Sequence, residues 1–340
     1  MIRLGIVGCG AVAEICHLPA AELSRRSRIT ALADIHVSRA QRLAQQYGVE
    51  YCTDDYHDLV SRIDGVIIAL PHHLHVPVAR EFLGHGVPVL VEKPLAFTRQ
   101  DANHLVEAAA RNSTLLQAGY MYRFCRGARL VKQAVDEGWL GPLQGFCLES
   151  GYVYDWPVAS AFNFTNLQAG GGVLIDTGSH MLDLLLWWLG DLQAVEYRDD
   201  AEGGIESDCC LSLAHRSAAA LNGEVILSRV RKLNDTARVI GELFTIEYDV
   251  STADQVRIWP THAPAEPVSF VANYGARAPQ KWNYVYAEQL DAFARSIESG
   301  TPSLAPGESV LPVVALIENC YARRKPLNLP WMARPDPAPL

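Results

Sequence analysis

The chain has 340 residues, of which 49% are hydrophobic and 20% charged. This balance is typical of a globular protein long enough for about two domains. The formal net charge of −9 provides no basic field for a phosphate backbone, and no apolar run approaches the ~20 residues that span a membrane. We therefore expect a cytoplasmic protein with neither a nucleic-acid nor a membrane partner. The cysteines form no C-x-x-C pair, which favours reduced core residues over a zinc or redox site.

A glycine turn follows the first apolar run of the chain. Residues 4–7 indicate a buried strand that ends at Gly8-x-Gly10-x-x-Ala13, the spacing of a dinucleotide-binding turn. Gly8 permits the tight turn, Gly10 lets the backbone approach a pyrophosphate, and Ala13 lets the next helix pack closely. The cofactor-binding residues expected in this turn are Gly8, Gly10, Ala11 and Val12.

The second predicted strand, residues 29–34, ends in a carboxylate. Asp34 lies 21 residues beyond Ala13, about where a Rossmann fold places the acid that binds the adenosine ribose. A carboxylate there repels a 2′-phosphate, so NAD is predicted as the cofactor in preference to NADP. Arg39 lies five residues further and can compromise that preference, so it joins the candidates for cofactor binding.

Helix and strand patterns alternate as far as residue ~120. Pro19 interrupts the first helix, which we expect to restart with this proline in its first turn. Ser38-x-x-Gln41 suggests a capping box for a helix over 38–47, and Thr98 is the expected cap of a later helix. The further strands are predicted at 65–70, 87–91 and 115–118. This alternation predicts a doubly wound parallel sheet with its ligands at the carboxyl edge.

Two strand ends in this half carry polar residues. The strand over 65–70 leads into Pro71-His72-His73-Leu74-His75, where consecutive side chains point apart and no carboxylate set accompanies them. We therefore predict no metal site, but a polar loop beside the cofactor. The next strand leads into Glu92-Lys93-Pro94. The cofactor-binding residues expected at these two ends are Leu70, Pro71, His75, Glu92 and Lys93.

The second half contains an apolar helical run over residues 173–188. Helical spacing places Asp176, His180 and Asp183 on one face of it, and acids there are costly to bury unless they are paired or functional. Histidine suits the proton transfer that accompanies hydride transfer, whereas Asp183 is interpreted as structural. An aromatic loop over 151–156 suits either a carbohydrate or the core. Short alternating runs over ~192–275 predict an antiparallel sheet.

In order and spacing these motifs resemble the Gfo/Idh/MocA oxidoreductase family along essentially the whole chain. The resemblance implies that Lys93 lies between nicotinamide and substrate, with Glu92 orienting it, and that the Lys93–Pro94 bond is cis. It also implies that His180 is the general acid/base and Asp176 its neighbour at the substrate. A homodimer or homotetramer formed through the second sheet is expected as well. The residues expected to bind substrate are Lys93, Arg123, Tyr154, Trp156, Asp176 and His180.

The predicted architecture is α/β: an N-terminal Rossmann domain over 1–122 with a doubly wound parallel sheet, then an α+β domain over 123–330. The second domain is expected to carry a large open, mostly antiparallel sheet, and 331–340 a loose tail. The expected activity is hydride transfer between NAD(H) and a hydroxyl or keto carbon of a sugar, cyclitol or related polyol. The alternatives are an epimerase or glycoside-cleaving enzyme with tightly held NAD, and a catalytically silent sensor of a dinucleotide or sugar. Lys93 and His180 together count against the silent alternative.

Overall fold

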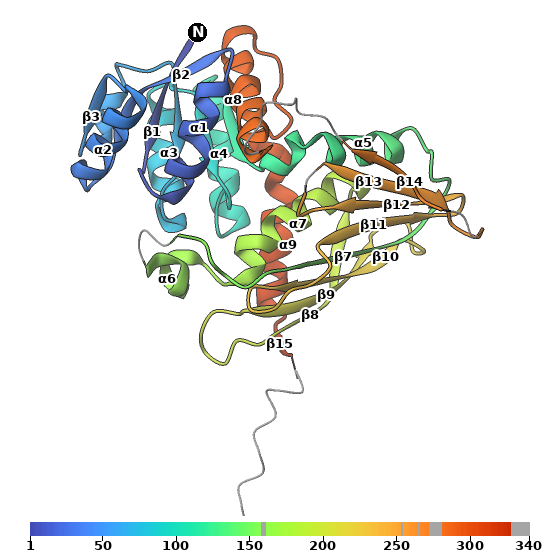
Figure 1. Cartoon of the computed structure of the whole chain (residues 1–340). Helices are drawn as coiled ribbons and strands as arrows, with labels where there is room; N and C mark the ends of the chain where they lie inside the picture. Colours follow the sequence, from blue (N-terminus) through green and yellow to red (C-terminus); the bar gives the residue numbers. More distant parts are fainter. Residues whose placement is uncertain (158–160, 253, 264–265, 272–280, 328–340) are drawn as a thin grey trace, which may run out of the picture.

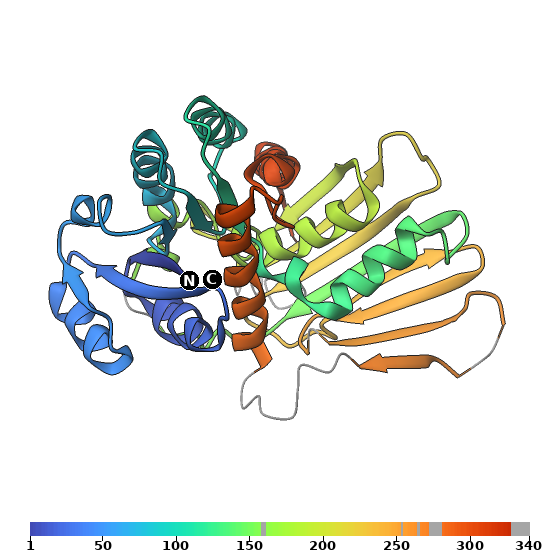
Figure 2. The same cartoon turned by 90° about the horizontal axis from the view of Figure 1, so that it is seen from above.

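Two β-sheets organise the chain in the computed structural model, which describes residues 1–157, 161–252, 254–263, 266–271 and 281–327 (Figure 1). The expected loose tail over 331–340 lies outside these residues. Within them, one sheet has six strands and the other nine. Figures 1 and 2 show the two sheets next to each other, with helices between them. The predicted two-part α/β architecture is confirmed.

The first sheet is entirely parallel. Its order is β3-β2-β1-β4-β5-β6, the doubly wound order of a Rossmann fold. Its central strands are buried on both faces, which explains their continuous apolar sequences. The strands are β1 (Ile2–Val7), β2 (Ser27–Ala33), β3 (Tyr51–Thr53), β4 (Gly65–Ile68), β5 (Val89–Glu92) and β6 (Leu116–Gly119). Their carboxyl ends meet at one edge, where the order reverses between β1 and β4.

The helices of this half follow local sequence signals. A π turn over Ala13–His17 precedes α1 (Leu18–Leu23), which has Pro19 in its first turn as predicted. Thr98 caps α4 (Arg99–Arg111) by accepting a hydrogen bond from the Asp101 N–H at 3.1 Å, also as predicted. The capping box predicted at Ser38 is wrong, because α2 (Val37–Tyr47) already begins at Val37. The remaining helix is α3 (His75–Gly84).

The second sheet is mostly antiparallel, in the order β14-β13-β12-β11-β7-β10-β9-β8-β15. The pairs β7·β10 and β8·β15 are parallel. Its strands are β7 (Leu143–Gly151), β8 (Leu192–Asp199), β9 (Asp208–His215), β10 (Asn222–Ser228), β11 (Thr236–Gly241), β12 (Phe244–Asp249), β13 (Gln255–Pro260), β14 (Val268–Val271) and β15 (Lys325–Pro326). Helices α5 (Arg126–Asp136) and α7 (Val173–Leu189) cover one face (Figure 2), while no described helix covers the other. No helix in the described ranges is long and apolar enough to cross a membrane.

The last part of the chain returns to the first sheet. Helix α8 (Lys281–Ser299) runs beside β1 and α1 (Figures 1 and 2), and a Cβ at Gly65 would lie 2.8 Å from Ile297 on α8. The Ala118 N–H of β6 donates to the Ala305 carbonyl at 2.9 Å. Helix α9 (Leu311–Ala322) then packs between α4 and α7. The domain boundary expected at residue 122 lies just after β6, the last strand of the first sheet. Helix α8 comes later in the chain, from the part assigned to the second domain, yet it packs against the first.

Candidate active site

The glycine turn lies at the carboxyl end of β1. Gly8 has φ +98°, and a Cβ there would lie 2.3 Å from the Ala69 carbonyl oxygen, so the turn excludes a side chain. A Cβ at Gly10 would have no atom within 4 Å, so the backbone is open to a ligand on that side. The Asp34 carboxylate accepts the Cys9 N–H at 2.8 Å. The turn and its acid therefore fit a dinucleotide, with free carboxylate lone pairs for the ribose hydroxyls.

His75 follows β4 but is not free to bind a cofactor. Its ring is 1% exposed, with Nδ1 2.8 Å from the Pro94 carbonyl and Nε2 2.8 Å from the Leu70 carbonyl. Burial lowers its pKa, so a neutral ring donates to one of the two carbonyls. The cofactor-binding role expected for His75 is therefore corrected, because the side chain instead ties the loop after β4 to the loop after β5. Leu70 and Pro71 remain partly exposed at the end of β4.

Lys93 reaches from the end of β5 to the second domain. The Lys93–Pro94 bond is cis, as the family resemblance implied. The Lys93 Nζ lies 2.6 Å from Asp176 Oδ1 and 3.1 Å from the Asp176 carbonyl oxygen on α7. Burial by itself would raise the pKa of Asp176, but the Lys93 ammonium and its hydrogen bond outweigh burial and lower it. The pair joins residues 83 apart in sequence where the end of β5 meets α7.

His180 lies one helical turn beyond Asp176 and is partly exposed. Its ring meets Tyr120 and Tyr122 edge-on, with centroids 6.0 and 5.2 Å away. Burial, and then the Lys93 ammonium, hold the pKa of His180 well below its usual value. The Nδ1 atom is buried and has no hydrogen-bond partner in the described part of the chain. The imidazole is therefore neutral near pH 7, so it can accept a proton.

Glu206, which the sequence analysis did not single out, anchors the start of α7. Its Oε1 accepts the Gly172 and Leu174 N–H groups at 2.9 and 3.0 Å, and the Tyr321 hydroxyl at 2.8 Å. A carboxylate there satisfies free helix-terminal donors and complements the helix dipole. A Cβ at Gly172 would lie 1.9 Å from the Glu206 carbonyl, so the glycine run before α7 allows this close approach. No local sequence signal indicated this role of Glu206, because its backbone partners at Gly172 and Leu174 lie more than 30 residues away.

Arg123 is a structural residue, which corrects its expected place in substrate binding. Its side chain is 3% exposed and forms two bonds of 2.6 and 2.9 Å to Asp183, itself 1% exposed. Three further bonds go to the Leu304 carbonyl and to Ser309. All five guanidinium N–H donors are thus used. The pair fixes α7 against the turn after β6, and both carboxylate oxygens of Asp183, which the sequence analysis interpreted as structural, accept from Arg123.

The loop after β7 brings aromatic side chains toward α7. The Tyr152 hydroxyl lies 3.3 Å from the Thr177 hydroxyl, and burial, with Asp176 as a second cause, raises the pKa of Tyr152 to about 12. Tyr154 packs against Tyr152, with ring centroids 6.2 Å apart, whereas Trp156 is 38% exposed. Tyr152 therefore contacts α7 through Thr177, although the sequence favoured Tyr154 and Trp156 as substrate-binding residues.

His72 joins the two domains on the same side. Its Nδ1 donates to the Ala169 carbonyl at 2.9 Å, and its ring lies 5.2 Å from that of Phe162. Burial, and then the neighbouring His75 and Lys93, lower the pKa of His72 to about 3. His72 is therefore neutral at physiological pH. It was expected only as part of a polar loop, because its partner lies 97 residues away.

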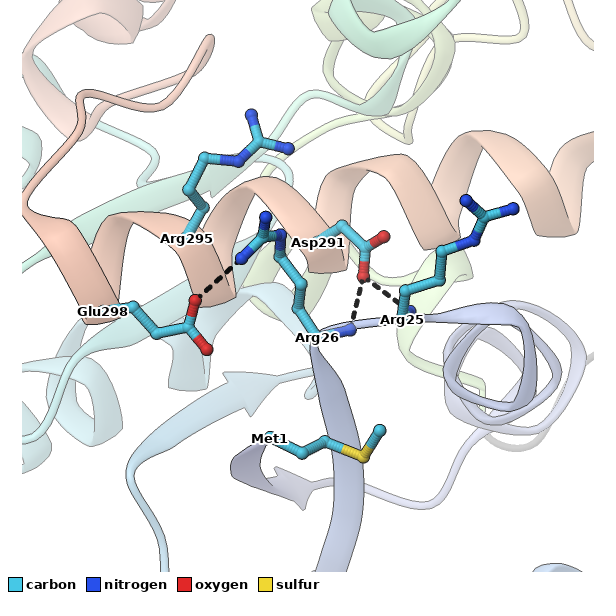
Figure 3. A pocket seen from close by; sticks show the side chains of 6 residues that line it. All are labelled: Met1, Arg25, Arg26, Asp291, Arg295 and Glu298. Carbon is cyan, nitrogen blue, oxygen red and sulfur yellow. Dashed lines mark hydrogen bonds and ion pairs between the residues drawn. The ribbon is translucent and has the colours of Figure 1, made fainter.

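A charged cavity of about 500 Å³ lies at the opposite edge of the first sheet (Figure 3). Met1 precedes β1, while Arg25 and Arg26 precede β2, so the cavity lies at the amino ends of the strands. The Asp291 carboxylate accepts the Arg25 and Arg26 N–H groups, and the Arg26 side chain pairs with Glu298 at 2.9 Å (Figure 3). A doubly wound sheet binds its ligands at the carboxyl edge, so this cavity is not the cofactor site. No group of three or more metal-ligating side chains occurs within the described ranges.

Two family models match consecutive parts of the chain. Residues 2–120 match the NAD-binding Rossmann fold of the Gfo/Idh/MocA oxidoreductase family, and residues 128–247 match a C-terminal domain of that family. The chain belongs to the Gfo/Idh/MocA oxidoreductase family. The cofactor class of this first domain is a nicotinamide dinucleotide, NAD or NADP.

Curated relatives match over a little more than half of the chain. The rhizopine catabolism protein MocA of Rhizobium meliloti is 33% identical over 55% of this chain and 57% of its own length. An inositol 2-dehydrogenase of Burkholderia ambifaria is 30% identical over 56% of this chain and 55% of its own length. A D-glucoside 3-dehydrogenase of Escherichia coli is 30% identical over 56% and 54%. The matched part thus spans about half the length of these relatives.

Solved structures match the fold over nearly the whole chain. KijD10, a 3-ketoreductase from Actinomadura kijaniata in complex with NADP and TDP-benzene, superposes with a TM-score of 0.82 at 24% identity. This match covers 97% of this chain and 99% of the other. A levoglucosan dehydrogenase in complex with NADH and levoglucosan gives 0.82 at 19% identity, covering 95% and 98%. These matches establish the fold of both domains together.

Proposed function

We propose that this chain is an NAD(P)-dependent oxidoreductase that transfers hydride to or from a hydroxyl or keto carbon of a sugar, cyclitol or related polyol. The contact of Lys93 with Asp176 carries this proposal, because it places a partly buried ammonium where the end of β5 meets α7. The polyol class is supported by the relatives named as inositol and glucoside dehydrogenases. A protein that only senses its ligand needs neither this pair nor a neutral histidine next to it.

Lys93 would polarise the reacting oxygen. An ammonium carries three N–H donors, and two of these are directed at Asp176. The third can donate to the substrate oxygen, where it stabilises the alkoxide-like charge that develops as hydride leaves or joins carbon. Asp176 holds the ammonium in place. A bound nicotinamide would supply the hydride donor or acceptor.

His180 would move the proton. In the direction of alcohol oxidation, the neutral imidazole accepts the hydroxyl proton, and in the direction of ketone reduction the imidazolium returns it. Helical spacing from Asp176 keeps His180 on the face of α7 that Lys93 reaches. The carboxylate also lowers the free energy of the imidazolium, since it is the one influence that raises the pKa of His180.

We further propose that NAD is preferred to NADP and that Asp34 makes the choice. Its carboxylate already faces the glycine turn through the Cys9 N–H. Two ribose hydroxyls can donate to the remaining lone pairs, whereas a 2′-phosphate meets a like charge. Titration of the protein with NADH and NADPH tests this choice, and tighter binding of NADPH would contradict it.

The activity is tested by offering NAD and NADP with a panel of cyclitols, hexoses and glycosides while NADH or NADPH absorbance is followed. Reduction of the dinucleotide with at least one polyol, lost in Lys93→Ala, supports the proposal. Stable binding of NAD without turnover of any polyol or ketosugar would contradict it.

We also propose that two copies of the chain associate through the face of the second sheet that no described helix covers. Light scattering after size exclusion tests this association.

A further inference from the structure

A buried histidine from the first helix contacts the carboxylate that precedes Lys93. The His17 Nε2 lies 2.7 Å from Glu92 Oε1, with the two side chains 0% and 8% exposed. His17 ends the π turn that follows the glycine turn, and Glu92 is the last residue of β5. The contact therefore joins the segment after β1 to the strand end that carries the lysine.

The other oxygen of Glu92 turns back onto the backbone of Lys93. Glu92 Oε2 accepts the Lys93 N–H at 3.2 Å, and a Cβ at Gly119 on β6 would lie only 3.0 Å from the same oxygen. The carboxylate is thus confined between β6, His17 and the Lys93 peptide. With one oxygen held by His17, the other is directed at the peptide from which the lysine side chain departs.

No other role accounts for His17 among the described residues. Its Nδ1 is buried and has no hydrogen-bond partner there, and its ring meets Tyr286 of α8 edge-on at 5.2 Å. The single directed interaction of the side chain is the one with Glu92. A fully buried imidazole with one polar partner is costly to retain unless that partner needs it.

We propose that His17 is a positioning residue for Lys93, acting through Glu92, which rests on the proposed function of Lys93. His17 holds the Glu92 carboxylate, Glu92 holds the Lys93 peptide, and the peptide sets the direction in which the ammonium reaches Asp176. His17 acts through Glu92 and not by contact with the substrate. It acts on kcat rather than on cofactor affinity, because the ammonium is aligned with charge that develops only in the transition state.

Four substitutions separate this role from simple packing. His17→Phe keeps the ring volume and removes the donor, whereas His17→Gln keeps an N–H at the same number of bonds from the backbone as Nε2. Glu92→Met removes both oxygens of the partner, and with them its hydrogen bonds to His17 and to the Lys93 N–H. Cys16→Ala is the matched control, because Cys16 is buried in the same π turn and its side-chain hydrogen bond is with Tyr286. If His17→Phe does not fold, His17→Asn, which is one bond too short to reach Glu92, takes its place.

We expect His17→Phe to lower kcat by roughly tenfold or more, since small misplacements of a catalytic group have effects of that order. The KM and the dissociation constant of NADH should change far less than kcat. His17→Gln should recover most of kcat, and Cys16→Ala should retain it. In the Glu92→Met background, which has no side-chain oxygen for either His17 or the Lys93 N–H, His17→Phe should lower kcat no further, because its only route to Lys93 is already broken.

Several results would overturn the proposal. They are wild-type kcat in the folded His17→Phe protein, an equal loss of kcat on adding His17→Phe to the Glu92→Met background, or a loss of kcat that His17→Gln does not recover. A crystal structure of His17→Phe decides the matter independently of turnover, since unmoved Glu92 and Lys93 would contradict the proposed coupling. If the wild-type protein turns over no polyol while Lys93 is displaced in that crystal, the proposed function fails and the coupling stands.

Discussion

Removing the Lys93 ammonium is the sharpest test of the proposed chemistry. Two of its three donors are directed at Asp176, so one remains for the reacting oxygen. Loss of a single donor to a developing oxyanion lowers kcat by roughly 10²–10³, or about 2.7–4 kcal/mol. We therefore expect Lys93→Ala to lower kcat by that amount, while the dissociation constant of NADH stays near the wild-type value.

The same variant should change the pH dependence. The Lys93 ammonium is the second cause, after burial, that lowers the pKa of His180. Without it, the imidazolium is less disfavoured, so the limb of the kcat/KM profile that reports His180 should move to higher pH. Steady-state kinetics over a series of buffers of constant ionic strength measures both effects.

A matched control is Lys132→Ala, which removes a lysine from a surface pair with Asp136 on α5. Its kcat should equal that of the wild-type protein. The reasoning is refuted if Lys93→Ala keeps kcat within about threefold of wild type, since that is less than 1 kcal/mol of transition-state stabilisation. A large rise in the NADH dissociation constant would instead show that Lys93 acts in binding the cofactor.

Three further outcomes are expected. Asp34→Ala should shift the NADPH-to-NADH affinity ratio toward NADPH, because the like charge that opposes a 2′-phosphate is gone. Arg123→Met should lower the free energy of unfolding by about 3–5 kcal/mol, since it leaves a buried Asp183 carboxylate without its cation. As the pH falls below about 6.5, the pKa of an unfolded histidine, the unfolded state binds a proton at residue 72 that the folded state excludes down to about pH 3. His72 should therefore lower the free energy of unfolding by about 1.4 kcal/mol for each pH unit of acidification in this range. His72→Asn, which keeps a donor for the Ala169 carbonyl but cannot titrate, should reduce that slope.

Each of these outcomes has its own control measurement. Isothermal titration with both dinucleotides measures the Asp34 effect, and an unchanged affinity ratio would show that another residue selects the cofactor. Arg216→Met breaks an exposed pair with Asp191 and should cost no more than about 1 kcal/mol in urea unfolding, in contrast to Arg123→Met. Urea unfolding of wild type and His72→Asn from pH 7 to pH 4 compares the slopes, and equal slopes would show that His72 does not titrate in the unfolding reaction.

Local sequence determined the elements that depend on neighbouring residues. The glycine turn needs a backbone at positive φ with no side chain, which Gly8 provides. The cap at Thr98 rests on a hydrogen bond within one turn of helix. The helix restart at Pro19 rests on the fixed φ of proline, whose missing N–H is not needed in a first turn. The alternation of buried strands and amphipathic helices then permits few topologies other than a doubly wound sheet. The order and spacing of the motifs also indicated the family, and with it Lys93, Asp176 and His180.

Only the tertiary structure decided which side chains are free for chemistry. Arg123 uses all five donors inside the protein, and both His75 ring nitrogens face backbone carbonyls, although the sequence favoured substrate and cofactor contacts. Glu206 and His17 gained positioning roles from partners that lie more than 30 residues away. Sequence patterns indicate the hydrophobic periodicity of helices and strands and the residues at which they begin and end. The partner of a buried polar group is set by which segments the two sheets bring together. Local propensity carries no information about that choice, because it is made by packing across the domain boundary.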